Sequence, residues 1–133
     1  MIIGVVIGLL VGSLVNGGII ALSPHVIPPP AGADLTTEAG LQAAMQLMEP
    51  KHYLMPFLAH ALGSLVGAFI ASKIAPVGRH IPALIVGAIF MAGGIYMAKI
   101  LPAPTWFEAT DIIVAYIPAA LLGYVLAKSR VNR

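Results

Sequence analysis

The chain has 133 residues, of which 59% are hydrophobic and 9% are charged, and its formal net charge is +2. Soluble domains carry about 25% charged residues, so this chain has too little polar surface for a water-soluble fold. The sequence contains no cysteine, which excludes disulfides, thiolate metal sites and cysteine nucleophiles.

Several segments are long and apolar enough to cross a membrane, because a spanning helix needs about 20 mostly apolar residues. The chain therefore predicts an all-α membrane protein, with four transmembrane helices in an antiparallel bundle and a single domain over residues 1–133. The first segment has no Lys or Arg before its apolar core, so we expect a retained helix rather than a cleaved signal peptide. The predicted spans are residues 2–22, 53–75, 81–101 and 109–127.

The first span carries a stripe of small residues. Gly4, Gly8 and Gly12 recur at intervals of four and therefore lie on one face of the helix. Small residues allow the backbones of two membrane helices to approach closely. Asn16 continues the same stripe, so we expect its amide to face a neighbouring helix and not the lipid.

Residues 23–52 form the longest connection between spans. The consecutive prolines at 28–30 predict an extended polyproline strut. Thr36 or Thr37 is expected to cap a short amphipathic helix, which would lie on the outer membrane surface or over the mouth of the bundle. The apolar face of this helix consists of Leu41, Ala44, Met45 and Met48.

The second span repeats this arrangement around a histidine. His60 precedes Gly63, Ser64 and Gly67 by three, four and seven residues, so all of them share one helix face. An ionisable residue inside a membrane span is by default a candidate functional site.

The last two spans each add a tyrosine to the pattern. Tyr96 follows Ala88 and Ala92 at intervals of four, and Tyr116 precedes Ala119 and Gly123 by three and seven residues. We therefore expect both tyrosines to lie on the packing faces of their helices.

These polar residues all lie within about two helical turns of the same end of the bundle. They predict a polar layer around an outward-facing vestibule, and Pro118 is expected to bend the fourth span at this level. The alternative interpretation is a structural hydrogen bond between helices, for example from Asn16 to His60. The predicted binding residues are Asn16, His60, Ser64, Tyr96 and Tyr116. The predicted packing residues are Gly4, Gly8, Gly12, Gly63, Gly67, Ala119 and Gly123.

Three side chains in the outer half have metal-binding chemistry, since imidazole and thioether groups suit copper. They are His25, His52 and Met48, but no two histidines stand at a helical ligand spacing. We therefore predict neither a metal nor a cofactor.

The distribution of charge predicts the orientation in the membrane. Most basic residues flank the short turn between the second and third spans or lie in the C-terminal tail, whereas all acidic residues fall on the other side. The positive-inside rule then places both termini in the cytoplasm, and we expect the plasma (inner) membrane of a bacterium. Glu108 and Asp111 are expected to cap the fourth span. The cytoplasmic basic residues are Lys73, Arg79, Lys128, Arg130 and Arg133.

Asn16, the segment PPPAGAD at 28–34 and the segment FLAHALGSLVGAFIASKIA at 57–75 resemble a group of small four-span bacterial membrane proteins. Members of that group share an Asn, a Pro-rich loop with Gly and Asp, and a Gly-rich second span. The resemblance covers the first half of the chain. It implies the four-span fold and carries over no activity, cofactor or site residue.

The sequence predicts an oligomeric binding, transport or channel-like element with an outward-facing polar vestibule. The alternatives are a structural or accessory subunit of a membrane complex and a membrane-embedded enzyme that acts on a lipid-like substrate. The expected partners are the lipid bilayer, further copies of the chain and a small-molecule or ion ligand. Nucleic acid is not expected, because the basic residues stand at span ends and form no patch.

Overall fold

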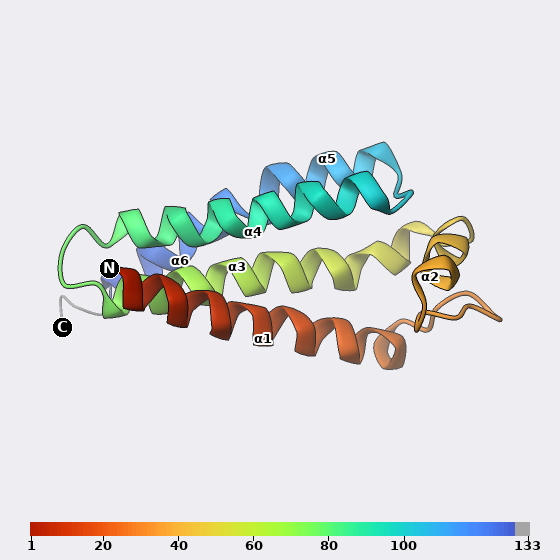
Figure 1. Ribbon diagram of the computed structural model, residues 1–133, viewed down its shortest axis with the longest axis horizontal. Helices are drawn as coiled ribbons and strands as arrows, with labels where there is room; N and C mark the ends of the chain where they lie inside the picture. Colours follow the sequence, from red (N-terminus) through yellow and green to blue (C-terminus); the bar gives the residue numbers. More distant parts are fainter. Residues whose placement is uncertain (130–133) are drawn as a thin grey trace.

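The computed structural model describes residues 1–129, and this part of the chain is all-helical. Its helices run back and forth along one long axis, and the N-terminus lies at the end opposite to helix α2 (Figure 1). We call these two ends the N-terminal end and the α2 end. The elements are α1 (Ile2–Val26), α2 (Glu38–Met45), the 3-10 helix η1 (Pro50–Tyr53), α3 (Leu54–Ile74), α4 (His80–Ile100), α5 (Thr105–Val114) and α6 (Ile117–Ser129).

The predicted four-span membrane bundle is confirmed. Four helical segments of 21 to 25 residues are long and apolar enough to cross a membrane, with η1 and α3 forming one segment and α5 and α6 another. The first helix continues past its predicted end at 22 as far as Val26 and includes Pro24 in its last turns. The fourth segment begins at Thr105, directly after Pro104, rather than at 109.

Helix α3 occupies the centre of the bundle. It packs along α1 on one side and against α6 and α4 on the other. Its buried residues are mostly small, which lets several neighbours approach its backbone. They are Ala59, Gly63, Ser64, Gly67, Ala68, Ala71 and Ser72.

The predicted glycine stripe of α1 forms the contact with α3. A Cβ atom added to Gly8 would lie 2.5 Å from the carbonyl oxygen of Gly67, and one added to Gly12 would lie 2.6 Å from that of Gly63. Real Cβ atoms are never found so close to a backbone oxygen. Only glycine therefore allows α1 and α3 to pack at this separation. On the other side of α3, a side chain at Gly123 would collide with the carbonyl oxygen of Leu65.

Helix α4 packs through a different stripe from the one that continues to Tyr96. Ala88 and Ala92 face outward, whereas Ala83 and Gly87 are buried. Both stripes consist of residues small enough for close helix packing. The stripe with Ala83 and Gly87 faces the core, because the methyl group of Ala120 on α6 packs directly against Gly87. The core of the bundle includes Ala68, Ala71, Ala83, Val86 and Ala120.

The helices separate toward the α2 end. At this end Asn16 of α1, His60 of α3 and Gly94 of α4 border a cavity. The fourth segment also breaks here, because Pro118 has no N–H to donate to the carbonyl of Val114. The bend predicted at Pro118 is therefore found between α5 and α6.

The connection after α1 returns over the α2 end. Thr37 caps α2 through its hydroxyl oxygen, which accepts a hydrogen bond of 3.0 Å from the amide of Gly40, so the predicted cap is confirmed. Before the helix, the amide of Thr36 donates to Asp34 over 2.9 Å, and the two hydrogen bonds from Thr36 hold the pKa of Asp34 below its usual value. The side chain of Gln42 on α2 donates to the carbonyl of Ile100, which ties α2 to the end of α4.

Candidate functional site

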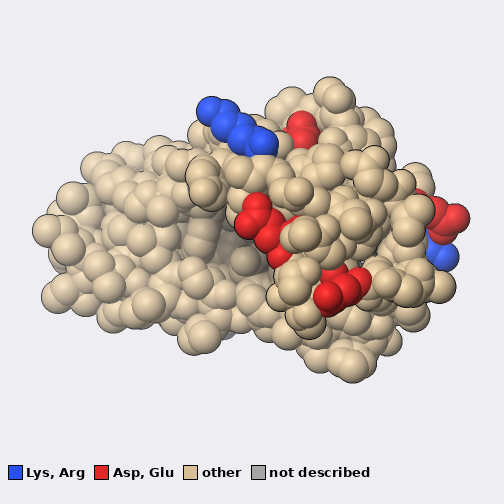
Figure 2. All heavy atoms as spheres, turned by 45° about the vertical axis from the view of Figure 1, so that its right-hand side comes forward, with Lys and Arg blue, Asp and Glu red and all other residues tan. Residues whose placement is uncertain are grey.

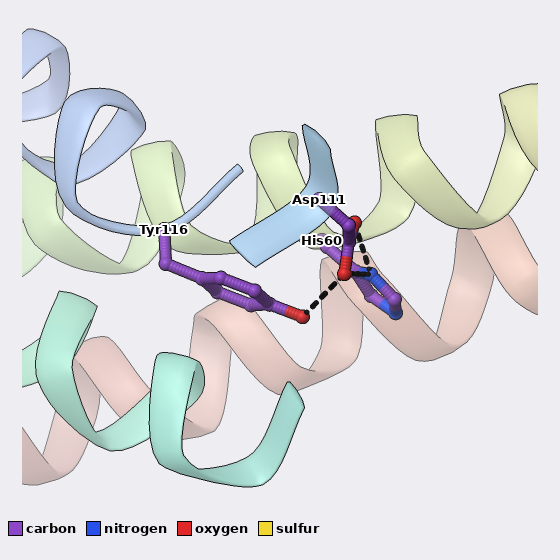
Figure 3. Close-up of polar contacts among 3 residues, drawn as sticks. All are labelled: His60, Asp111 and Tyr116. Atoms are coloured by element: carbon purple, nitrogen blue, oxygen red, sulfur yellow. Dashed lines mark hydrogen bonds and ion pairs between the residues drawn. The ribbon is translucent and has the colours of Figure 1, made fainter. Parts of the chain in front are cut away.

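His60 lies in the second turn of α3 and is held by a carboxylate from another helix. Its Nδ1 lies 2.8 Å from Oδ1 and 3.0 Å from Oδ2 of Asp111, which stands on α5 (Figure 3). With Asp111 in its ionised form, which only accepts hydrogen bonds, Nδ1 is the donor of this contact. The Nε2 atom points away from Asp111 and has no hydrogen-bond partner within residues 1–129.

Tyr116 completes this group from the break between α5 and α6. Its hydroxyl donates a hydrogen bond of 3.0 Å to Oδ2 of Asp111, and its ring stacks on the His60 ring with centroids 5.7 Å apart. The hydroxyl end of Tyr116 lies directly over Gly94 of α4, where any Cβ atom would collide with it. We call His60, Asp111 and Tyr116 the polar triad.

Asp111 is the most buried charged group of the site, at 5% exposed. Burial of a carboxylate is costly unless it is hydrogen-bonded, and here both oxygens accept. No Lys or Arg among the described residues pairs with it. The negative charge is therefore stabilised by hydrogen bonds and not by a permanent positive charge.

The polar triad borders a cavity in two parts. The main chamber, of about 510 Å³, lies at the α2 end beneath α2 and the connection that follows α1. The side chamber, of about 220 Å³, continues toward the centre of the bundle. Both chambers are lined by Asn16, His60, Gly94 and Met97.

The walls of the main chamber are mainly apolar. Met45 and Met48 cover it from α2 and the turn that follows, so the predicted apolar face of this helix lies over the mouth of the bundle. Tyr53 and Phe107 form an aromatic wall, with ring centroids 4.6 Å apart. Glu108 is the one carboxylate besides Asp111 that lines this chamber.

Three buried polar atoms in residues 1–129 have no hydrogen-bond partner, and all three belong to residues that line the chambers. They are Oδ1 of Asn16, the hydroxyl of Tyr53 and the hydroxyl of Ser64. Ser64 is 1% exposed and Tyr53 is 4% exposed. An unpaired buried polar group typically costs about 1–3 kcal/mol, so such groups mark places where water or a ligand is bound.

Most of the predicted binding residues come together. Asn16, His60, Ser64 and Tyr116 line the side chamber. Tyr96 does not, because it is 64% exposed and continues the outward face of α4. Tyr96 therefore shares the exposed face of α4 with Ala88 and Ala92, outside the chambers of this chain.

Asp111 is the functional residue that sequence reasoning missed. It was expected to cap a helix, but α5 begins at Thr105 and places it more than a turn inside. The available signal was a lone acid directly before the apolar run IIVAYI, five residues ahead of Tyr116. The proposed bond between Asn16 and His60 is not formed, because His60 takes Asp111 as its partner and Asn16 Oδ1 stays unpaired.

Of the metal candidates, His52 and Met48 line the main chamber, whereas His25 does not. Among residues 1–129, no group of three or more His, Cys, Asp or Glu side chains is placed to hold a metal ion. His52 uses both ring nitrogens locally, since Nδ1 accepts from the amide of Glu49 and Nε2 lies 3.1 Å from the carbonyl oxygen of Pro28.

No protein-family model matches the chain, and neither a curated protein nor a solved structure matches it. The chemistry of the site must therefore be argued from its own geometry.

Proposed function

We propose that the protein is a membrane-embedded binding element whose main chamber takes an amphipathic small molecule from the outer side of the membrane. The observation that carries this proposal is an apolar chamber of about 510 Å³ with a fixed imidazole in its wall. Chambers of this size, lined by apolar groups with a few placed polar ones, are typical of small-molecule sites. A structural bond between α3 and α5 needs neither this space nor unpaired buried oxygens.

The closed N-terminal half favours binding over open conduction. The contact of Gly8 with the backbone of Gly67 leaves no room between α1 and α3 beyond the chambers. A ligand would therefore enter and leave by the α2 end, which the positive-inside rule places outside the cell. Transport would require these two helices to separate.

A membrane-embedded enzyme is the second candidate, because a histidine held by a carboxylate is the usual arrangement of a general base. His60 Nε2 would accept the proton in such a reaction. Ser64, one turn along α3, has no hydrogen bond to this ring, so the geometry gives His60 no activated nucleophile. This favours binding over catalysis.

Association of several copies is a separate proposal. Ala88 and Ala92 expose a small-residue face on α4, of the kind through which membrane helices pack closely. Chemical crosslinking in native membranes tests it.

A cavity-filling variant tests the binding proposal. Ala98 of α4 lines the main chamber, so Ala98→Trp should fill part of it, whereas Ala21→Trp adds the same bulk at an exposed position of α1 that lines neither chamber. Thermal unfolding of the purified protein is measured against a library of amphipathic compounds. We expect compounds that raise the Tm of the wild type and of Ala21→Trp but not of Ala98→Trp. A library without effect on the wild type, or with equal effect on both variants, would contradict the proposal.

A further inference from the structure

We infer that the main chamber selects an amphipathic amine in its ammonium form, with the charged head on the polar triad and the apolar body under α2. This inference rests on the proposed function and names its ligand class. It is drawn from the charges, the hydrogen-bonding character and the shape of the chamber walls.

The charged side chains that line the main chamber are both acidic. They are Glu108 and Asp111, and neither Lys nor Arg lines the main or the side chamber. The other titratable side chains that line it are His52, His60 and Tyr53. Both ring nitrogens of His52 already contact the segment between α1 and α3, namely the amide of Glu49 and the carbonyl oxygen of Pro28, so this ring has no free nitrogen for a ligand. A ligand with a carboxylate or phosphate head would meet like charge here, whereas an ammonium head would neutralise the buried charge of Asp111.

Several free polar atoms of the chambers can accept a hydrogen bond from a ligand, and the hydroxyls of Tyr53 and Ser64 can also donate one. Asn16 presents an unpaired Oδ1, and a neutral His60 with its hydrogen on Nδ1 presents Nε2 as a lone pair. The hydroxyl oxygen of Ser64 is a further acceptor, 1% exposed and without a partner among residues 1–129. An ammonium group has only donors, so it matches this set. An alcohol supplies one donor and no charge.

The aromatic wall suits the same head group. Tyr53 and Phe107 both line the main chamber, and their ring centroids lie 4.6 Å apart. The face of an aromatic ring attracts a cation by its quadrupole. The apolar side chains of Leu41, Met45 and Ile20 then provide contacts for a hydrocarbon body.

The surface around the mouth carries the same sign of charge. Acidic side chains gather at the α2 end beside a recess in the surface, with few basic ones between them (Figure 2). Lys51 and Glu49 neutralise each other, since Oε2 of Glu49 lies 3.3 Å from Nζ of Lys51, and Lys99 in the last turn of α4 is the other Lys or Arg at this end among the described residues. Such an arrangement raises the local concentration of cations and lowers that of anions.

A matched set of photoreactive lipids tests the inference. Decylamine, decanol and decanoate, each with a diazirine at the end of the chain, differ only in the head group, which is cationic, neutral or anionic. The full-length protein is reconstituted in phosphatidylcholine nanodiscs, and crosslinked peptides are mapped by mass spectrometry. We expect decylamine to label the chamber residues Leu41 and Met45, beside which its hydrocarbon end would lie, with a half-saturating concentration on the order of tenfold lower than that of decanol, with decanoate weakest.

A charge-neutralising pair of variants sharpens the test. Glu108→Gln removes the carboxylate at the chamber wall and should weaken labelling by decylamine several-fold, on the order expected for one partly solvated charge pair, without changing decanol. Glu38→Gln removes an exposed carboxylate of the same end that does not line the chamber, so it should weaken decylamine labelling less than Glu108→Gln does and leave decanol unchanged.

Preferential labelling by decanol or decanoate at the same residues would overturn the ammonium inference while leaving the chamber a binding site. Labelling by all three probes at lipid-facing residues alone, such as Tyr96, would also overturn it. The library screen with Ala98→Trp judges the binding proposal independently, because it makes no assumption about charge.

Discussion

The face of α1 that carries the glycine stripe has different surroundings in the two halves of the bundle. In the N-terminal half, Gly8 of α1 meets the backbone of Gly67, and an added Cβ atom would lie 2.5 Å from its carbonyl oxygen. In the α2 half, the same face continues to Asn16 and Ile20, which line the main chamber. The first half is closed by backbone contact, and the second is left open around the polar triad.

The difference shows how a small membrane bundle can be both stable and hollow. Lipid offers no hydrophobic force to close a gap between helices, so association depends on close packing and on polar contacts. Here the close packing is concentrated at one end. At the other end, the hydrogen bonds of Asp111 to His60 and Tyr116 connect α3, α5 and the start of α6 across the open space.

Glycine substitutions should give the largest difference in stability between the two halves. Gly8→Leu forces α1 away from α3, so we expect loss of about 3 kcal/mol or more in the free energy of unfolding, at the upper end for overpacked sites. Gly18→Leu on the same helix should change it by less than about 0.5 kcal/mol. Thermal and denaturant unfolding in detergent measure both. Equal stability of the two variants would mean that α1 does not pack on α3 as described.

Removal of the carboxylate should destabilise the open half. Asp111→Ala leaves Nδ1 of His60 and the hydroxyl of Tyr116 without their acceptor, and we expect a loss of about 1–3 kcal/mol. Glu108→Ala is the control on the same helix, since Glu108 forms no hydrogen bond or ion pair through its side chain within the described part of the chain. Unfolding curves for the two variants give the comparison. If Asp111→Ala is as stable as Glu108→Ala, the polar triad does not hold the helices together.

The two buried serines of α3 allow a finer comparison of stability between the closed half and the open half. Ser72 donates a hydrogen bond of 2.9 Å to the carbonyl of Arg79, so Ser72→Ala should cost about 1 kcal/mol. Ser64 is equally buried but unpaired, so Ser64→Ala should leave the stability unchanged or raise it while weakening ligand binding. The same unfolding assay compares them. A destabilised Ser64→Ala protein would show that its hydroxyl has a partner and that the side chamber is not free.

Cysteine labelling tests the orientation of the two ends with the least disturbance. The chain has no cysteine, so Glu38→Cys at the α2 end and Val77→Cys in the turn between α3 and α4 each introduce a single thiol. We expect an impermeant maleimide to label Glu38→Cys in intact cells and Val77→Cys only after the membrane is opened. The reverse pattern would place the chambers on the cytoplasmic side.

The features that could be predicted best from the sequence are those that depend on the regular spacing of residues within one helix. The stripes of Gly8 and Gly67 and the cap at Thr37 follow from local spacing, and the structure confirms the helices that they organise. Local spacing does not decide which of two small stripes on α4 packs inward, because that choice depends on Ala120 of another helix.

The polar triad could not be predicted from local spacing either, because it depends on contacts between different helices. His60 and Asp111 are 51 residues apart, and their contact exists only because α5 packs beside α3. A carboxylate near a helix start is normally read as a cap. Its distance from the true helix start at Thr105 became clear only in the structure.

The state of the His60 ring tests the central claim most directly. Nitrogen-15 spectra of the histidine-labelled protein in bilayers are recorded before and after addition of the ligand that stabilises it most, and His60→Gln assigns the signal among the four histidines. We predict that Nδ1 carries the hydrogen toward Asp111 and that the Nε2 resonance shifts when the ligand binds, but not in Ala98→Trp. An Nδ1 atom without hydrogen, or an Nε2 resonance that is unchanged at saturation, would contradict a chamber organised around His60.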